Sequence, residues 1–322
     1  MPAPDEPIAA PLIALDWGSS SLRAYLMRGP LDVADSRSAP WGILHLPDGG
    51  FEAALQQLCG DWLTQYPTTP VIAAGMVGSA QGWREAPYAT APAGLGDLAS
   101  QLAVVTVAGG RRIAIVPGVR TGGIRPNVMR GEETQIFGVL AMANDRDAPT
   151  ELLVLPGTHS KWVVAADGRI IDFLTFMTGE LFAVLCEHSI LGRLMPSSAV
   201  FDQAAFERGA RMALDPTSPG PFSALFSVRS LGLTGVLPHS SLADYLSGLL
   251  IGTEIAEGKR AFTSSVDFAR QQIHLIGDEK LCERYRRVLP LFGLHALPAV
   301  THVATAAGLW RVALAAGLIA AR

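Results

Sequence analysis

Apolar residues along the chain occur in short runs that alternate with longer stretches of helical spacing. A run of about four to eight apolar residues between turn-forming residues is typical of a buried strand. The pattern predicts strands at Leu12–Leu15, Leu22–Met27, Val71–Ala74, Ile113–Val116, Leu152–Leu155, Trp162–Ala165, Ile170–Leu174 and Ile273–Ile276.

Helical spacing fills several of the intervals between these runs. Leu55, Leu58 and Trp62 share one face of a predicted helix over Phe51–Tyr66, which Pro67 ends. The alternation of strands and helices predicts an α/β fold. Further helices are predicted over Glu132–Ala143, through most of the stretch from Thr178 to Gly258 on either side of the DPTSPGP segment, and over Ala306–Ala320.

One local pattern occurs twice. A strand, a turn rich in Gly and hydroxyl residues, and a second strand follow one another over Leu12–Met27 and again over Leu152–Ala165. The copies lie about half a chain apart, which predicts two related halves rather than one doubly wound sheet. The length of 322 residues also suits two packed domains. We expect an N-terminal domain over residues 1–150 and a C-terminal domain over residues 151–322.

Composition and charge exclude several classes of partner. The net charge is −4 and no long run of one sign occurs, so we expect no nucleic-acid partner. The three cysteines lie too far apart for a disulfide framework or a metal cluster. The opening MPAPDEPIAAP is acidic where a signal peptide is basic, and Arg311 interrupts the C-terminal apolar stretch. These features predict a cytoplasmic protein without a membrane partner.

The two repeated turns carry the residue types of a phosphate site. Consecutive backbone N–H groups in a tight turn bind anions, and Ser or Thr hydroxyls add donors. Either turn alone could be an ordinary hairpin turn, but the matching pair favours two cradles for one polyphosphate. Asp16 is placed to hold Mg²⁺, mostly through water. The first cradle would use Gly18, Ser19, Ser20, Ser21 and Arg23, and the second would use Gly157, Thr158, Ser160 and Lys161.

Four segments resemble motifs of the actin-like ATPase and sugar kinase superfamily. LDWGSSSLRAYL resembles its first phosphate motif, and LPGTHSKWVV resembles its second. LIGDEKLCERY resembles the adenosine motif, and ATAAGLW resembles the helix that links the two domains. The resemblance implies two ribonuclease H-like α/β domains with ATP in the cleft between them. It also implies that Gly277 and Asp278 lie beside the adenosine, and that the last helix, about 304–322, packs back toward the first domain.

The chain resembles one family of that superfamily more closely, the 2-dehydro-3-deoxygalactonokinases. The blocks LDWGSSSLRAYL, GMVGSAQGWREAPY, GGIRPNVMRGEETQIFG, LPGTHSKWV and FMTGELFAVLCEHSIL carry this resemblance. It implies a phosphotransferase that uses ATP and Mg²⁺ and acts in galactonate catabolism. The acceptor would be the C6 hydroxyl of 2-dehydro-3-deoxy-D-galactonate, and the products would be the 6-phosphate and ADP.

Phosphoryl transfer to a hydroxyl needs a carboxylate that takes the hydroxyl proton. In the broader sugar kinases a Gly-Asp pair opens the helix ahead of the second phosphate turn, and Gly131-Glu132 occupies the matching place. We expect Glu132 to be the base, with Glu133 as the second candidate. Both could instead serve only to stabilise the N-terminus of the helix.

A keto acid needs a cation or a cluster of N–H donors for its carboxylate. Arg84, Arg125 and Arg130 lie in two polar loops and are the candidates, although any of them could be a surface residue. GMVGSAQGW resembles the sugar-binding loop of carbohydrate kinases. The remaining substrate candidates are Ser79, Gln81 and Trp83 of that loop, Asn127, and Trp17, which could pack against the sugar or anchor its own turn.

Three alternative functions stay open. The first is a kinase for another 2-keto-3-deoxy sugar acid or a sugar, because the residues do not decide the C4 configuration. The second is a non-catalytic protein that senses a sugar acid on the same fold. The third is a filament-forming or chaperone-like ATPase. The partner expected in the first two cases is a small molecule, and the residues leave a homodimer open.

Overall fold

The protein is described from a computed structural model, which covers residues 12–142, 150–196, 200–218, 220–298, 300 and 302–320. The acidic opening segment and most of the polar loop expected after residue 143 lie outside these residues. The chain forms two compact units. Unit 1 comprises Met1–Pro149, Ala165–Asp172 and Thr301–Arg322, and unit 2 comprises Thr150–Val164 and Phe173–Val300.

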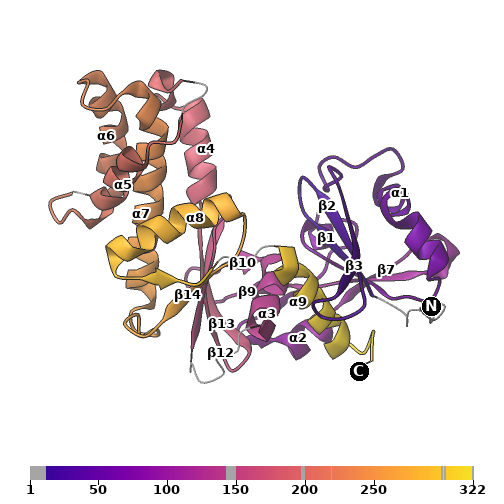
Figure 1. Ribbon diagram of the computed structural model, residues 1–322. Helices are drawn as coiled ribbons and strands as arrows, with labels where there is room; N and C mark the ends of the chain where they lie inside the picture. Colours follow the sequence, from indigo (N-terminus) through magenta and orange to yellow (C-terminus); the bar gives the residue numbers. More distant parts are fainter. Residues whose placement is uncertain are drawn as a thin grey trace, which may run out of the picture. The chain divides into compact units, whose positions relative to one another are not determined.

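Unit 1 is built on a mixed sheet in the order β3-β2-β1-β4-β8-β7. Figure 1 labels β1, β2, β3 and β7 of this sheet. β1 is antiparallel to β2 and parallel to β4, and β4 is parallel to β8. The strands are β1 (Leu12–Trp17), β2 (Leu22–Met27), β3 (Val33–Ala39), β4 (Val71–Ala74), β7 (Ala103–Thr106) and β8 (Arg112–Ile115). A smaller sheet joins β5 (Tyr88–Thr90), β9 (Gly118–Arg120) and β10 (Val128–Met129).

Two helices of unit 1 pack closely against each other. α3 lies against α9 (Figure 1), and a Cβ on Gly138 would stand 1.9 Å from the carbonyl oxygen of Ala304. A Cβ on Gly308 would stand 1.7 Å from the carbonyl oxygen of Thr134. Glycine at both positions therefore permits backbone-to-backbone contact. The helices of unit 1 are α1 (Gly50–Gln65), α2 (Leu95–Ala99), α3 (Glu132–Met142) and α9 (His302–Ala315).

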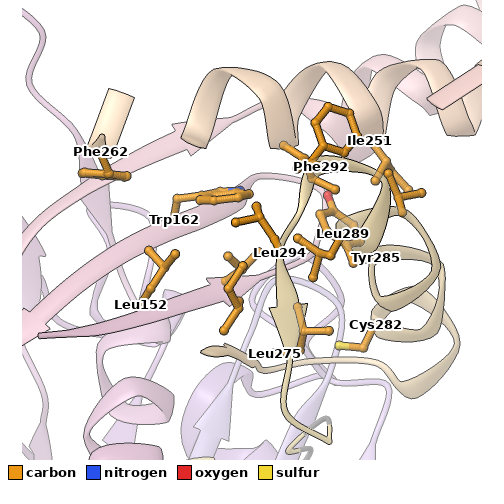
Figure 2. Packing of buried hydrophobic residues seen from close by; sticks show 14 of the residues in the cluster. Leu152, Trp162, Ile251, Phe262, Leu275, Cys282, Tyr285, Leu289, Phe292 and Leu294 are labelled. Atoms are coloured by element: carbon orange, nitrogen blue, oxygen red, sulfur yellow. The ribbon is translucent and has the colours of Figure 1, made fainter. Parts of the chain in front are cut away.

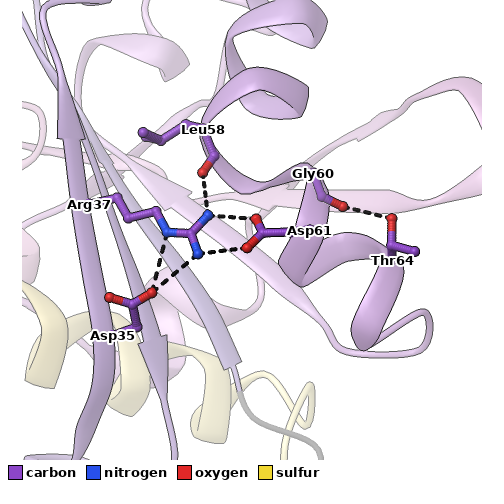
Figure 3. A network of polar contacts seen from close by, with 6 residues as sticks. All are labelled: Asp35, Arg37, Leu58, Gly60, Asp61 and Thr64. Carbon is purple, nitrogen blue, oxygen red and sulfur yellow. Dashed lines mark hydrogen bonds and ion pairs between the residues drawn. The ribbon is translucent and has the colours of Figure 1, made fainter.

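An arginine network ties the edge strand β3 to α1 (Figure 3). Arg37 binds Asp61 through both terminal nitrogens, at 2.5 and 2.7 Å, and also reaches Asp35 and the carbonyl of Leu58. The guanidinium lies 4.1 Å above the ring of Trp62. Hydrogen bonding from Arg37 lowers the pKa of Asp61 to about 2.

A second mixed sheet, in the order β15-β14-β11-β12-β13-β6, carries unit 2, while β6 pairs with Arg169 and Ile170 at the start of β13 within unit 1. The five strands from β13 to β15 repeat the order of β3-β2-β1-β4-β8, with β11 parallel to β14 and β14 parallel to β15. The two related halves predicted from the repeated turn are therefore present. The strands are β6 (Ala93–Gly94), β11 (Glu151–Leu155), β12 (Ser160–Ala166), β13 (Arg169–Phe176), β14 (Gln272–Leu275) and β15 (His295–Ala296).

The core of unit 2 lies between its sheet and the helices α7 and α8. Figure 2 shows Trp162, Ile251 and Tyr285 among its packed side chains. The helices are α4 (Thr178–His188), α5 (Gln203–Arg211), α6 (Pro221–Leu233), α7 (Leu242–Phe262) and α8 (Glu279–Val288). Single 3₁₀ turns cover Met76–Gly78, Ala108–Gly110, Gly192–Leu194, Met212–Leu214, His239–Ser241 and Leu289–Phe292.

All eight predicted strands and the four predicted helical regions are present, with ends that differ by a few residues. The C-terminal helix is the largest shift, because it runs over His302–Ala315 and stops before Gly317, whose φ is 66°. The turn between β12 and β13 has Asp167 and Gly168 at φ values of 50° and 69°, as a tight two-residue hairpin requires. No helix in the described part of the chain is long and apolar enough to cross a membrane.

Candidate active site

The first turn joins β1 to β2, and the segment around Gly42 packs against it. The backbone N–H of Gly18 donates to the carbonyl of Ser21 at 3.0 Å, which closes the turn. Ser19 and Ser20 are exposed at its tip. Gly42 packs on this tip so closely that a Cβ there would lie 2.2 Å from the carbonyl oxygen of Ser19. The turn is therefore a supported, solvent-facing loop, as a phosphate cradle must be.

Asp16 is at the end of β1, where its side chain is 18% exposed. Arg23 is its cross-strand partner on β2, and the Arg23 Nη1 lies 3.4 Å from the Asp16 carboxylate. Among the residues that the structure describes, no group of three or more His, Cys, Asp or Glu side chains could hold a metal ion. A single carboxylate fits Mg²⁺ that is bound mainly by water and phosphate oxygens.

Three segments meet at this edge of the unit 1 sheet. Gly75, directly after β4, has a φ of 98°, and a Cβ there would lie 2.7 Å from the carbonyl oxygen of Trp17. A Cβ on Gly131 would lie 3.1 Å from the Cα of Gly75. The start of α3 is thus brought to the ends of β1 and β4 by two glycines. The sequence interpretation did not include Gly75, although Gly after a buried strand is a signal for such close approach.

The two candidate bases differ sharply in exposure. The Glu132 carboxylate is partly exposed and accepts a hydrogen bond from the Arg130 backbone N–H at 3.0 Å. The Glu133 side chain is fully buried and accepts from the Gly131 backbone N–H at 2.7 Å. Burial, followed by the charge of Glu132, raises the pKa of Glu133 to about 8. Glu132 is therefore the carboxylate that an incoming substrate can reach.

The three candidate arginines are also in different surroundings. Arg84 and Arg125 are exposed, whereas the Arg130 side chain is only 9% exposed. Its guanidinium lies 4.2 Å above the Tyr88 ring and donates to the carbonyl of Ala86 at 2.8 Å. Its Nε and Nη1 are buried without a hydrogen-bond partner among the described residues. Of these three arginines, Arg130 is the one with buried donors that have no partner among the described residues.

The remaining substrate candidates of unit 1 are divided between its core and its surface. Trp17 is fully buried, donates to the Trp41 carbonyl at 2.8 Å and packs edge-on against Phe51 and Trp83, which favours its interpretation as an anchor of the turn. Trp83 is half-buried and stacks on Phe51. Ser79 is buried, Gln81 is exposed, and the Asn127 side-chain amide donates to the carbonyl of Arg125.

The second turn joins β11 to β12 in unit 2. Thr158 is exposed and Gly157 partly so, as a cradle for phosphate requires. Ser160 and Lys161 differ from the expectation, because both side chains are buried, at 0% and 3% exposure. The Ser160 hydroxyl bonds the Tyr285 hydroxyl at 3.1 Å, and the Lys161 ammonium donates to the His159 carbonyl at 3.1 Å. The Ser160 hydroxyl therefore faces into the unit, whereas the Lys161 ammonium stays at the turn on the His159 carbonyl.

Two further contacts in unit 2 involve the turn and the adenosine motif. His159 Nε2 lies 2.5 Å from the carboxylate of Glu180, a residue that the sequence interpretation did not include. Gly277 has a φ of 147°, and a Cβ there would lie 3.2 Å from the carbonyl oxygen of Pro156. Asp278 caps α8 by accepting from the Leu281 N–H at 3.0 Å, which is a structural role.

Comparison with known proteins gives the family. Residues 16–312 match the family described as 2-keto-3-deoxy-galactonokinase. The 2-dehydro-3-deoxygalactonokinase of Escherichia coli strain K12 is 38% identical over 312 residues, which are 95% of this chain and 98% of the relative. A protein of Rhizobium meliloti strain 1021, provisionally assigned the same activity, is 37% identical over 92% of this chain and 94% of its own length.

A solved structure agrees with the fold. The crystal structure of a protein from Sinorhizobium meliloti, provisionally assigned as a 2-dehydro-3-deoxygalactonokinase, superposes with a TM-score of 0.82 and 35% identity, over 94% of this chain and 98% of that one. The expected fold class, two α/β domains of the actin-like type, is confirmed by this match and by the two related sheets. The chain belongs to the 2-keto-3-deoxy-galactonokinase family.

Proposed function

We propose that this protein phosphorylates 2-dehydro-3-deoxy-D-galactonate at its C6 hydroxyl, with ATP as the donor. The observation that carries the proposal is the 38% identity to the Escherichia coli enzyme of that activity over 95% of this chain. The solvent-facing turns and the accessible carboxylate described above are compatible with this chemistry. The cellular role is the consumption of a sugar acid in galactonate catabolism, inside the cytoplasm.

Each of the two repeated turns would bind phosphate oxygens of the nucleotide. Ser19 and Ser20 at the tip of the first turn, and Gly157 and Thr158 at the tip of the second, would supply backbone N–H groups and hydroxyls. Gly277, whose φ of 147° would strain any residue with a side chain, would lie beside the adenosine. Asp16 would hold Mg²⁺ through water, and the ion neutralises phosphate charge when bound.

Glu132 would act as the general base. It lies at the first position of α3, where a partly exposed carboxylate can accept the proton of the acceptor hydroxyl. Glu133 is a poorer base in this position, because its buried side chain cannot reach an acceptor without a rearrangement of α3. The substrate carboxylate would bind Arg84 or Arg125, whose side chains are exposed, whereas the unpartnered Nε and Nη1 of Arg130 are buried and would reach it only after a rearrangement.

The experiment that tests this function measures ADP release by the purified protein with a panel of acceptors. The panel contains 2-dehydro-3-deoxy-D-galactonate, its C4 epimer, the analogue whose carboxylate is reduced to an alcohol, and no acceptor. We expect the highest kcat/KM with the galacto acid and a loss of at least about a hundredfold with the reduced analogue, since an ionic hydrogen-bonded pair is lost. A preference for the reduced analogue would overturn the proposal, and ADP release without any acceptor would favour an ATPase.

A further inference from the structure

A buried carboxylate in unit 2 is surrounded by hydrogen-bond donors. Glu254, on α7, is 2% exposed. Its Oε1 accepts from the indole Nε1 of Trp162 at 2.9 Å, and its Oε2 accepts from the Tyr285 hydroxyl at 2.7 Å and from the Thr178 hydroxyl. The donors come from three elements, β12, α8 and α4, so one side chain joins them all to α7.

One branch of this network runs directly to the second turn. The Tyr285 hydroxyl, which bonds Glu254, also bonds the hydroxyl of Ser160 at 3.1 Å. The Ser160 hydroxyl in turn lies 3.4 Å from both the backbone nitrogen and the carbonyl oxygen of Gly157. Glu254 is thus linked through two hydroxyls to the glycine at the start of the turn.

The other branch reaches the turn through the N-terminus of α4. Thr178 is the first residue of that helix, and Gly179 follows it against the turn. A Cβ on Gly179 would lie 2.5 Å from the carbonyl oxygen of Gly157, and the Glu180 N–H donates to the carbonyl of Thr158 at 3.0 Å. The bond from Thr178 to Glu254 therefore fixes the helix end on which the turn rests.

A carboxylate in this position is an unfavourable choice for stability alone. Burial raises the pKa of Glu254, although the hydrogen bonds from Thr178, Tyr285 and Trp162 act in the opposite direction. An apolar side chain of similar size often stabilises a protein core as well as a buried charged group does. A carboxylate does, however, offer two acceptor oxygens on which several donors from different elements can converge.

We propose that Glu254 is a positioning residue, which holds the second turn in the conformation that binds the phosphates of ATP. The inference rests on the proposed function for the identity of the ligand. It goes beyond that function because Glu254 lies outside the turn and acts through Tyr285, Ser160 and Thr178.

The test compares Glu254→Gln with a matched control, Asp244→Asn. Asp244 lies on the same helix, is 7% exposed, and accepts bonds from the Asp202 N–H and from Arg284. It precedes Glu254 by ten positions, about 15 Å along the helix. Both changes convert a buried carboxylate of unit 2 to an amide. Only Glu254→Gln alters the hydrogen bonds that lead to the second turn.

Two readouts separate positioning from general stability. Hydrogen exchange of the backbone amides of residues 157–160 is measured without nucleotide, and the KM values for ATP and for the sugar acid are measured separately. In Glu254→Gln we expect exchange to accelerate at least about fivefold at the turn, because local opening becomes easier. We also expect the KM for ATP to rise at least about tenfold while that for the sugar acid changes less than about twofold.

We expect Asp244→Asn to lower the melting temperature but to leave unchanged both the hydrogen exchange of residues 157–160 and the KM for ATP. Tyr285→Phe, which removes only the bridging hydroxyl, should raise the KM for ATP about threefold and gives the answer if Glu254→Gln does not fold. The proposal would be overturned if Glu254→Gln and Tyr285→Phe both kept the wild-type rate of hydrogen exchange at residues 157–160 and the wild-type KM for ATP. If the wild type itself bound no nucleotide, the proposed function would fail, while turn exchange would still decide the role of Glu254.

Discussion

A carboxyl oxygen of Glu133 accepts a hydrogen bond from the backbone N–H of Gly131, at 2.7 Å, where α3 begins. Gly131 in turn rests against Gly75, so this bond lies where α3 begins beside the ends of β1 and β4. Glu133 is fully buried there, next to the partly exposed Glu132. The bond therefore stabilises the start of α3, which is also the segment that positions the candidate base Glu132.

The buried Glu133 makes stability depend on pH. Burial raises the pKa of its carboxyl from 4.5 to about 8. The folded protein therefore keeps a proton that the unfolded chain releases above pH 4.5, so the free energy of unfolding falls between pH 4.5 and 8 and levels off above 8. We expect Glu133→Gln, measured by denaturant unfolding from pH 5 to 8.5, to flatten this decline. Parallel curves for the variant and the wild type would contradict the prediction.

Replacement of Glu132 tests its role as the base. Glu132→Gln keeps the shape of the side chain and can still accept from the Arg130 N–H, but it cannot take up a proton. We expect kcat to fall by about 10²–10⁴ while ADP affinity changes little, because general-base catalysis is lost and nucleotide binding is not. Calorimetric titration with ADP is the control for folding. Near-normal turnover in the variant would show that another group accepts the proton.

Asp16 makes nucleotide binding depend on Mg²⁺ in the proposed function. We expect Asp16→Asn to lower the Mg²⁺-dependent gain in ADP affinity at least about tenfold, since the site's carboxylate is lost. Asp61→Asn is the matched control, because Asp61 is a 64% exposed carboxylate of the same unit that pairs with Arg37. Calorimetry with Mg²⁺ and with EDTA measures both. An equal Mg²⁺ dependence in wild type and Asp16→Asn would remove Asp16 from the metal site.

Contact between α3 and α9 gives a prediction for stability. Gly138→Ala would place a Cβ 1.9 Å from the Ala304 carbonyl oxygen, so the helices must move apart. We expect a loss of about 3 kcal/mol in the free energy of unfolding, as for an overpacked core. Gly96→Ala in α2 is the control, because a Cβ at Gly96 meets nothing within 4 Å. Similar stability of the two variants would mean that this helix contact is looser than described.

Much of the fold follows from local pattern. The apolar runs predict the central strands of both sheets, because those strands are short and buried on both faces. The edge strand β3 could not be predicted in this way. Its sequence VADSRSA is mostly polar and exposed, and it forms a strand because it pairs with β2 and binds α1 through Arg37.

The site residues that could not be predicted from the sequence were missed for a different physical reason. Residues of β12 are buried on both faces of the sheet, so alternation along the strand could not predict that Ser160 and Lys161 are buried. Glu254 has the spacing of an ordinary helix residue, and only the tertiary packing of β12, α4 and α8 brings its donors together. The turns themselves, by contrast, are local structures and could be predicted from their residues.

The most direct test of the central claim is ³¹P NMR of the product formed from ATP and 2-dehydro-3-deoxy-D-galactonate by the wild-type protein. We predict ADP and one new phosphomonoester, whose phosphorus couples to the two protons on C6. Omission of the sugar acid should leave ATP intact, because transfer needs the acceptor hydroxyl. Free inorganic phosphate without a sugar ester, or an ester at a carbon other than C6, would contradict the account.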